Sequence, residues 1–120
     1  MQRRTDPEVG RAALARVLEA HTMEPEDVRD AVRFLLEELA SRVPGRSVEV
    51  RVPPYGAVQC VEGPRHTRGT PPNVVEIDPM TWVALATGAA GEFGWAAATA
   101  EGLVQASGER ADLSAFLPLV

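Results

Sequence analysis

The chain has 120 residues, 45% of them apolar and 24% charged, which is the size and composition of one globular domain spanning residues 1–120. Its formal charge is −5 and its basic residues are all arginine, without a long basic stripe, so the composition argues against nucleic-acid binding. No apolar run of about 20 residues could insert into a membrane, and the single Cys60 cannot form an internal disulfide. We therefore expect a cytoplasmic protein.

Two helices are predicted in the amino-terminal third. A capping box from Thr5 to Glu8 precedes apolar residues at helical spacing that continue to about His21. A second helix start in the segment 22–26 leads into a broad apolar face that ends at Arg42.

Strands follow the second helix. From Ser47 to Val52 valines alternate with charged residues, which predicts a strand with one buried face. The segment 57–61 is predicted to be a second strand that follows a Pro/Gly turn. We expect the two strands to form an antiparallel hairpin. The segment 62–73 is rich in glycine and proline and is predicted to be a loop, and 74–77 is a short third strand.

The carboxy-terminal part is predicted to contain two short helices, one more strand and a final helical turn. Asp78 is the expected cap of a helix that ends at Thr87, followed by a short helix over 93–100, a strand over 103–107 and a final helical turn after Asp112. Helices and strands are thus largely segregated along the chain. This order predicts an α+β fold, with an antiparallel or mixed sheet of four to five strands and helices packed on one face.

The sequence also resembles a known family. The stretch from Trp82 to Gly88, then Trp95, then 102–113 resembles the ending of sterol carrier protein-like domains, and 56–76 is similar to small actinobacterial sterol carrier family proteins. The resemblance implies a five-stranded sheet whose helices enclose an apolar cavity for lipids or similar ligands. Related domains accompany the metal-binding bundle of mycothiol-dependent isomerases, but this chain lacks that bundle's spaced histidines, so the resemblance does not extend to their activity.

A ligand wall is expected where large apolar side chains of the second helix and the carboxy-terminal half converge. The candidates are Phe34, Leu39, Trp82, Leu85, Phe93 and Trp95. The alternative is that these side chains fill a solid core, because protein interiors are close-packed.

Polar candidates are few. Arg65, His66 and Arg68 lie on the Pro/Gly-rich loop and are expected to contact an anionic group such as a carboxylate or phosphate, with a solvated charged loop as the alternative. Cys60 and His66 could act as nucleophile and base, but no third orienting group is evident, and a buried thiol is the simpler interpretation. A metal site of Cys60, Glu62, His66 and Asp78 matches no strong zinc pattern and is set aside.

The function expected from these observations is non-catalytic binding or carriage of an apolar small molecule, such as a lipid, fatty acyl or sterol-like ligand. No cofactor, catalytic residue, metal or nucleic-acid partner is expected. The alternatives are a protein-interaction or homodimerisation module without a ligand and, less favoured, a thiol-dependent enzyme that uses Cys60.

Overall fold

The structure is a computed structural model that describes residues 5–63, 73–92 and 94–119. Within these ranges the elements are α1 (Pro7–Glu19), α2 (Pro25–Arg42), β1 (Val48–Val52), β2 (Gly56–Cys60), β3 (Val74–Ile77), α3 (Pro79–Thr87), α4 (Gly94–Ala100), β4 (Val104–Ser107) and a 3-10 turn (Ser114–Phe116). They follow the order that the sequence predicts.

Local hydrogen bonds explain where two of the helices begin. Asp78 caps α3, because its Oδ2 accepts from the Thr81 backbone nitrogen at 3.3 Å. The expectation that Thr5 caps α1 is wrong. Asp6 is the cap and its Oδ1 accepts from the Glu8 nitrogen at 2.8 Å, while the Thr5 nitrogen donates to Glu37 Oε1 on α2 at 3.0 Å. Thr5, which the local sequence favours as the cap, thus contacts α2 instead of capping α1.

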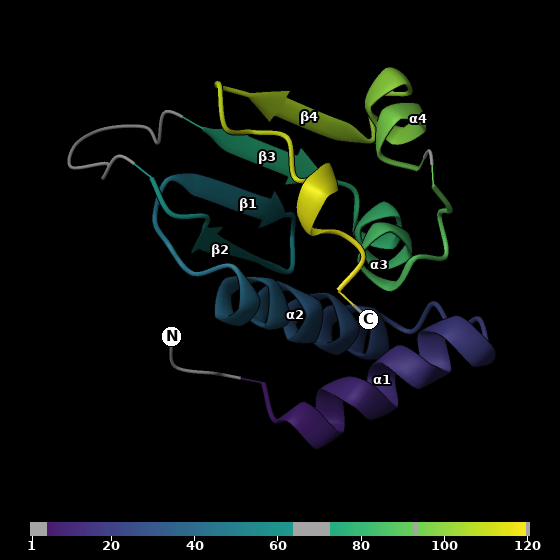
Figure 1. Cartoon of the computed structure of the whole chain (residues 1–120). Coiled ribbons are helices and arrows are strands. Elements are labelled where there is room, and N and C mark those ends of the chain that lie inside the picture. The colour runs from purple at the N-terminus through teal and green to yellow at the C-terminus, as the bar shows by residue number, and fades with distance from the viewer. Residues whose placement is uncertain (1–4, 64–72, 93, 120) are drawn as a thin grey trace.

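The described strands form one mixed sheet in the order β2-β1-β3-β4 (Figure 1). The β1–β2 hairpin and the β3–β4 pair are antiparallel, and β1 and β3 are parallel. The α+β fold with a mixed sheet is therefore confirmed. These four strands are the ones visible in the described ranges, one fewer than the resemblance implies.

The sheet has one apolar and one polar face. Val48, Val50 and Val52 of β1 are fully buried, whereas Glu49 and Arg51 between them are half-buried and form an ion pair. Because side chains alternate across a strand, the apolar side chains all face the helices. In Figure 1, α2 runs beside β2, and α3 lies near the carboxyl ends of β1 and β3.

The core fills the space between this face and the helices. Leu35 and Leu39 of α2 and Trp82 of α3 are fully buried, and the Trp82 indole Nε1 donates to the Val32 carbonyl at 3.3 Å. On its other side α2 packs against α1, where Gly10 lies directly over Phe34. Helix α1 thus covers the side of α2 that faces away from the sheet.

Candidate functional site

The side chains expected to form an apolar wall lie in different parts of the molecule. Leu39 and Trp82 are fully buried in the core, and Leu85 lies between α3 and α4. Phe34 instead faces α1, with the Arg11 guanidinium carbon 5.6 Å from its ring centroid. Trp95 is half-buried on α4, and Phe93 lies outside the described residues. The structure therefore does not gather the whole set at one site, and its role as a ligand wall stays a prediction.

Cys60 at the end of β2 is fully buried and pairs with Val48. Burial raises the pKa of its thiol to about 11, because the thiolate would lose its hydration. The side chain is therefore a neutral thiol near pH 7, which is the wrong protonation state for nucleophilic attack. Burial of the thiol disfavours the thiol-dependent alternative, and His66, the base expected to act with it, lies outside the described residues.

The remaining polar candidates are tested only in part. Arg65, His66 and Arg68 lie outside the described residues. Across the ranges that are described, no group of three or more histidine, cysteine or acidic side chains is arranged to hold a metal ion. Every helix in these ranges is also too short or too polar to serve as a membrane span.

A shallow groove separates α3 from α4. Its volume is about 350 Å³, and its lining consists of Met80, Thr81, Ala84, Leu85, Ala90, Gly94, Ala97, Ala98, Glu101 and Leu103. We call it the α3–α4 groove. Only Thr81 and Glu101 bring polar side chains to it. Gly94 permits the start of α4 to lie close to α3 and to the turn between them, because a Cβ atom there would lie 2.5 Å from the Ala90 Cβ and 3.3 Å from Leu85 Cδ2.

A larger groove follows β2 at the edge of the sheet. It has a volume of about 750 Å³ and is bounded by α2 on one side and residues 55–59 on the other, with Thr5 and residues 44–46 completing its lining. We call it the β2-edge groove. Its lining mixes apolar side chains such as Leu36 and Val58 with Arg33, Glu37 and Arg46.

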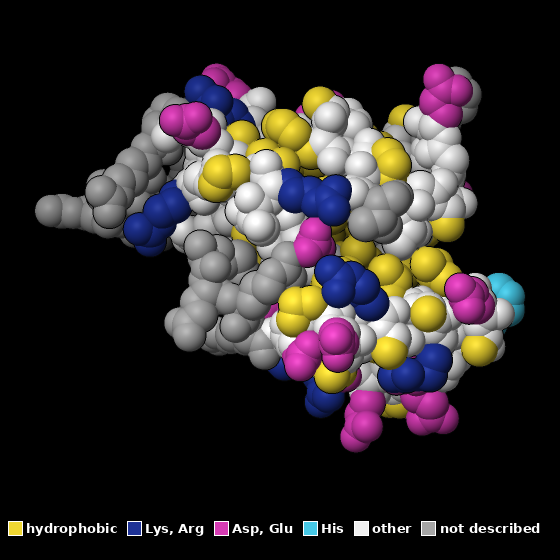
Figure 2. All heavy atoms as spheres, turned by 60° about the horizontal axis from the view of Figure 1, so that its bottom comes forward, with side chains coloured by type: hydrophobic (Ala, Val, Ile, Leu, Met, Phe, Trp, Pro, Cys, Tyr) yellow, Lys and Arg dark blue, Asp and Glu magenta, His cyan; other side chains and the backbone are white. Residues whose placement is uncertain are grey.

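Charges on the α1–α2 side of the molecule are interspersed. Figure 2 shows arginine and acidic side chains side by side on this face, without a patch of one sign. One pair joins the two helices: Arg16 Nη2 lies 2.7 Å from Asp27 Oδ1, and this hydrogen bond lowers the pKa of Asp27. Such a face lacks the concentrated positive charge that nucleic-acid binding needs.

The described residues form a small α+β domain with a mixed sheet and two surface grooves. Residues 24–119 match the family model described as bacterial SCP ortholog, so the chain belongs to this family of sterol carrier protein-like domains. The match covers α2 to the 3-10 turn and leaves α1 outside it. The comparison with curated protein sequences finds no match.

Most residues of both grooves were not predicted from the sequence. For the α3–α4 groove the sequence does contain a signal, which is the recurrence of alanine and glycine at 84, 90, 94, 97 and 98. Such small side chains leave space between helices. In the β2-edge groove no local signal exists, since the sequence of β2 does not reveal that the strand lies at an edge.

Proposed function

We propose that this protein binds and carries an apolar small molecule of the lipid, fatty acyl or sterol-like class, and that the α3–α4 groove holds its apolar part. Membership of the bacterial SCP ortholog family supports the carrier class. The location is supported by the lining of the groove, in which eight of the ten residues are apolar or glycine. An apolar concave surface is the usual form of a small-molecule site.

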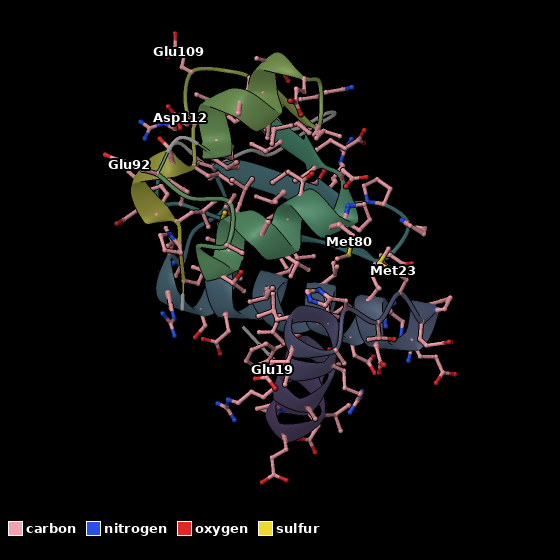
Figure 3. All side chains as sticks on the ribbon, turned by 90° about the vertical axis from the view of Figure 1, so that its right-hand side faces the viewer. Glu19, Met23, Met80, Glu92, Glu109 and Asp112 are labelled. Carbon is pink, nitrogen blue, oxygen red and sulfur yellow. The ribbon has the colours of Figure 1, made fainter. Side chains whose placement is uncertain are left out.

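The driving force would be the burial of apolar surface. Leu103 at the groove is 39% exposed and Met80 is half-buried, so the ligand would cover side chains that now contact water. Met23, in the α1–α2 connection, is 64% exposed and projects toward the same side of the molecule as Met80 (Figure 3). Each 100 Å² of apolar surface, counting groove and ligand together, that leaves water would contribute roughly 2.5 kcal/mol before the cost of ordering the ligand.

The size of the groove limits the ligand. A volume of about 350 Å³ is near the lower end of the range for small-molecule sites. One ring system or a short acyl segment fits this space, whereas a longer chain requires α4 to move away from α3. Helix α4 packs more extensively on β4 than on α3, so it could stay attached to β4 during such a movement.

The two tryptophans give a direct test. Trp95 lies on α4 next to the groove and Trp82 lies in the core, so a Trp82→Phe background isolates the signal from Trp95. Titration with decanoic acid, its coenzyme A thioester and a sterol should change the Trp95 emission for at least one ligand. Calorimetry on the unaltered protein gives the affinity independently of the background substitution.

Two variants on α4 locate the site. Ala97 lines the groove, whereas the adjacent Ala96 is exposed outside it, so Ala97→Phe fills the groove and Ala96→Phe is the matched control. We expect Ala97→Phe to weaken binding by roughly tenfold or more and Ala96→Phe to leave it unchanged. Equal affinities for the two variants would place the ligand elsewhere, and no binding of any of the three ligands would refute the carrier function.

A further inference from the structure

Strand β2 lies at one edge of the sheet, with β1 on its inner side. Among the described residues no strand pairs with its outer side. Edge strands present unpaired backbone groups and are commonly protected by proline, lysine or charged residues that point inward. The five residues of β2 are Gly-Ala-Val-Gln-Cys and carry none of these. The strand is therefore open to pairing.

The direction of its backbone groups follows from one hydrogen bond. The Glu49 nitrogen donates to the Asn73 carbonyl at 3.0 Å, so the backbone of Glu49 is directed at β3. Because direction alternates along a strand, Val48, Val50 and Val52 are directed at β2, and their partners Cys60, Val58 and Gly56 are directed back at β1. The backbone groups of Ala57 and Gln59 consequently point out of the sheet.

These outward groups line the β2-edge groove and decide what can occupy it. Ala57 and Gln59 both belong to its lining. A hydrocarbon placed there would remove backbone N–H and C=O groups from water without giving them partners, which costs free energy for each group. An extended peptide satisfies them, because its own backbone supplies the matching donors and acceptors.

Two arginines give the groove its charge preference. Arg33 Nε donates to the Tyr55 carbonyl at 2.7 Å and Arg46 Nε donates to Gln59 Oε1 at 3.1 Å, which places them near opposite ends of β2. Both bonds use Nε, so the Nη nitrogens of each guanidinium remain to receive a carboxylate. The third charged residue is Glu37, which is buried and whose Oε1 accepts from the Thr5 nitrogen.

The same charges disfavour pairing of β2 with the β2 strand of a second copy of the chain. A symmetric antiparallel β2–β2 pair centred on Val58 would align the outward groups of Ala57 and Gln59 with those of Gln59 and Ala57 in the other copy. It would also bring the Arg33 end of one strand beside the Arg46 end of the other. Two like charges at each end oppose this pairing, whereas a strand that carries carboxylates turns the same positions into attractions.

We propose that the outer edge of β2 binds an extended peptide segment with acidic side chains, which adds to the sheet as a further strand between β2 and solvent. Its backbone pairs with Ala57 and Gln59, and its carboxylates bind Arg33 and Arg46. Tyr55 and Gln59 are four residues apart, about 13 Å along a strand, so the acidic side chains that reach both arginines are about four positions apart. This site is separate from the α3–α4 groove.

The probe for this site is a fluorescein-labelled peptide, Val-Thr-Val-Glu-Val-Thr-Val-Glu, with a control peptide that has lysine at both glutamate positions. Fluorescence anisotropy with the full chain should show saturable binding of the glutamate peptide and at least tenfold weaker binding of the lysine peptide. Failure of the glutamate peptide to bind, or equal binding of the two peptides, overturns the proposal.

Proline variants at the two edges of the sheet test the mode of binding. Ala57→Pro removes an outward N–H that the sheet does not use, and proline is tolerated at such edge positions. Ala106 is the matched position on β4, because the Asp78 nitrogen donates to the Leu103 carbonyl and alternation then directs the Ala106 backbone outward. We expect Ala57→Pro to weaken the glutamate peptide by at least tenfold and Ala106→Pro to leave it unchanged. Equal affinities overturn strand addition at β2.

A surface variant keeps the test valid if Ala57→Pro folds poorly. Arg46 is exposed, and Arg46→Glu should abolish the preference for the glutamate peptide, because each peptide then meets one attractive and one repulsive charge. Unchanged preference contradicts the proposal. Sedimentation of the unaltered protein identifies the other occupant: a dimer that Ala57→Pro converts to a monomer would assign the edge to a second copy instead of a peptide.

Discussion

Cys60 shows how one side chain is defined by its surroundings. In sequence it is the only thiol of the chain, close to a histidine, which invites a catalytic interpretation. In the structure it is a fully buried member of the hydrophobic core. The residue type specifies what chemistry is available, and burial keeps this thiol away from solvent and in its neutral form.

The raised pKa of Cys60 has a consequence for stability at alkaline pH. The thiol ionises near pH 9 in the unfolded chain and at about 11 in the folded one, so the folded state holds its proton more tightly. Its contribution is complete below pH 9 and is lost as the pH rises through 11. Urea unfolding should show the native protein losing roughly 2 to 3 kcal/mol relative to Cys60→Ala over this window. A constant difference between the two proteins would contradict the burial of the thiol.

The ends of a helix are set by short-range interactions that can be recognised in the sequence, as α3 shows. Asp78 caps α3 through the Thr81 nitrogen and hydroxyl, and Gly88 ends the helix in the left-handed conformation with φ of 82°. A capping side chain and a glycine at the end are recognised without any tertiary information. This is why the bounds of α3 were predicted almost to the residue.

Removal of the α3 cap has a defined cost. Asp78→Ala leaves the first-turn N–H groups of α3 without a side-chain acceptor and should lower the free energy of unfolding by about 1 kcal/mol. Asp78→Ser should recover most of this loss, because the serine hydroxyl accepts the same hydrogen bond. The measurement is the urea midpoint of the three proteins. Equal losses in both variants would mean that the Asp78 side chain stabilises something other than the helix start.

At Gly10 of α1, tertiary packing should reverse the usual preference for alanine over glycine inside a helix. Alanine normally stabilises a helix interior by about 1 kcal/mol relative to glycine. At Gly10 the added Cβ would lie 2.6 Å from the Phe34 Cβ, so α1 and α2 would have to separate. Gly10→Ala should therefore destabilise the protein, by about 1 to 3 kcal/mol in chemical denaturation. A gain in stability would show that α1 does not pack on α2 as described.

At the scale of the whole molecule, α1, α2, the sheet and α3 contribute to one hydrophobic core. Because these elements lose their burial together, we expect urea unfolding to be a single cooperative transition. Far-ultraviolet circular dichroism, which reports helices, and the fluorescence of Trp82, which reports the core, should have coincident midpoints. Separate midpoints would divide the chain into independently folding parts.

Ligand and peptide binding are also properties of the whole molecule, since each site joins elements that are distant in the sequence. The α3–α4 groove adds Leu103 to two helices, and the β2-edge groove brings Thr5 and α2 to a strand that begins more than ten residues after α2 ends. The sequence predicted Leu85 as a site residue because it is large and apolar. It did not predict Ala84, Ala97, Arg33 or Arg46, whose importance depends on what lies opposite them.

By itself, the sequence determined the order and type of the elements, the hairpin and the buried face of β1, because periodicity, caps and turn residues act over a few neighbouring positions. The family followed from the resemblance of its sequence to sterol carrier protein-like domains. Only the tertiary structure decided that β1 and β3 are parallel neighbours, that β2 lies at the edge and that Phe34 faces α1. These features arise from contacts between residues far apart in the chain, and no local pattern encodes which distant partner a strand or helix will meet.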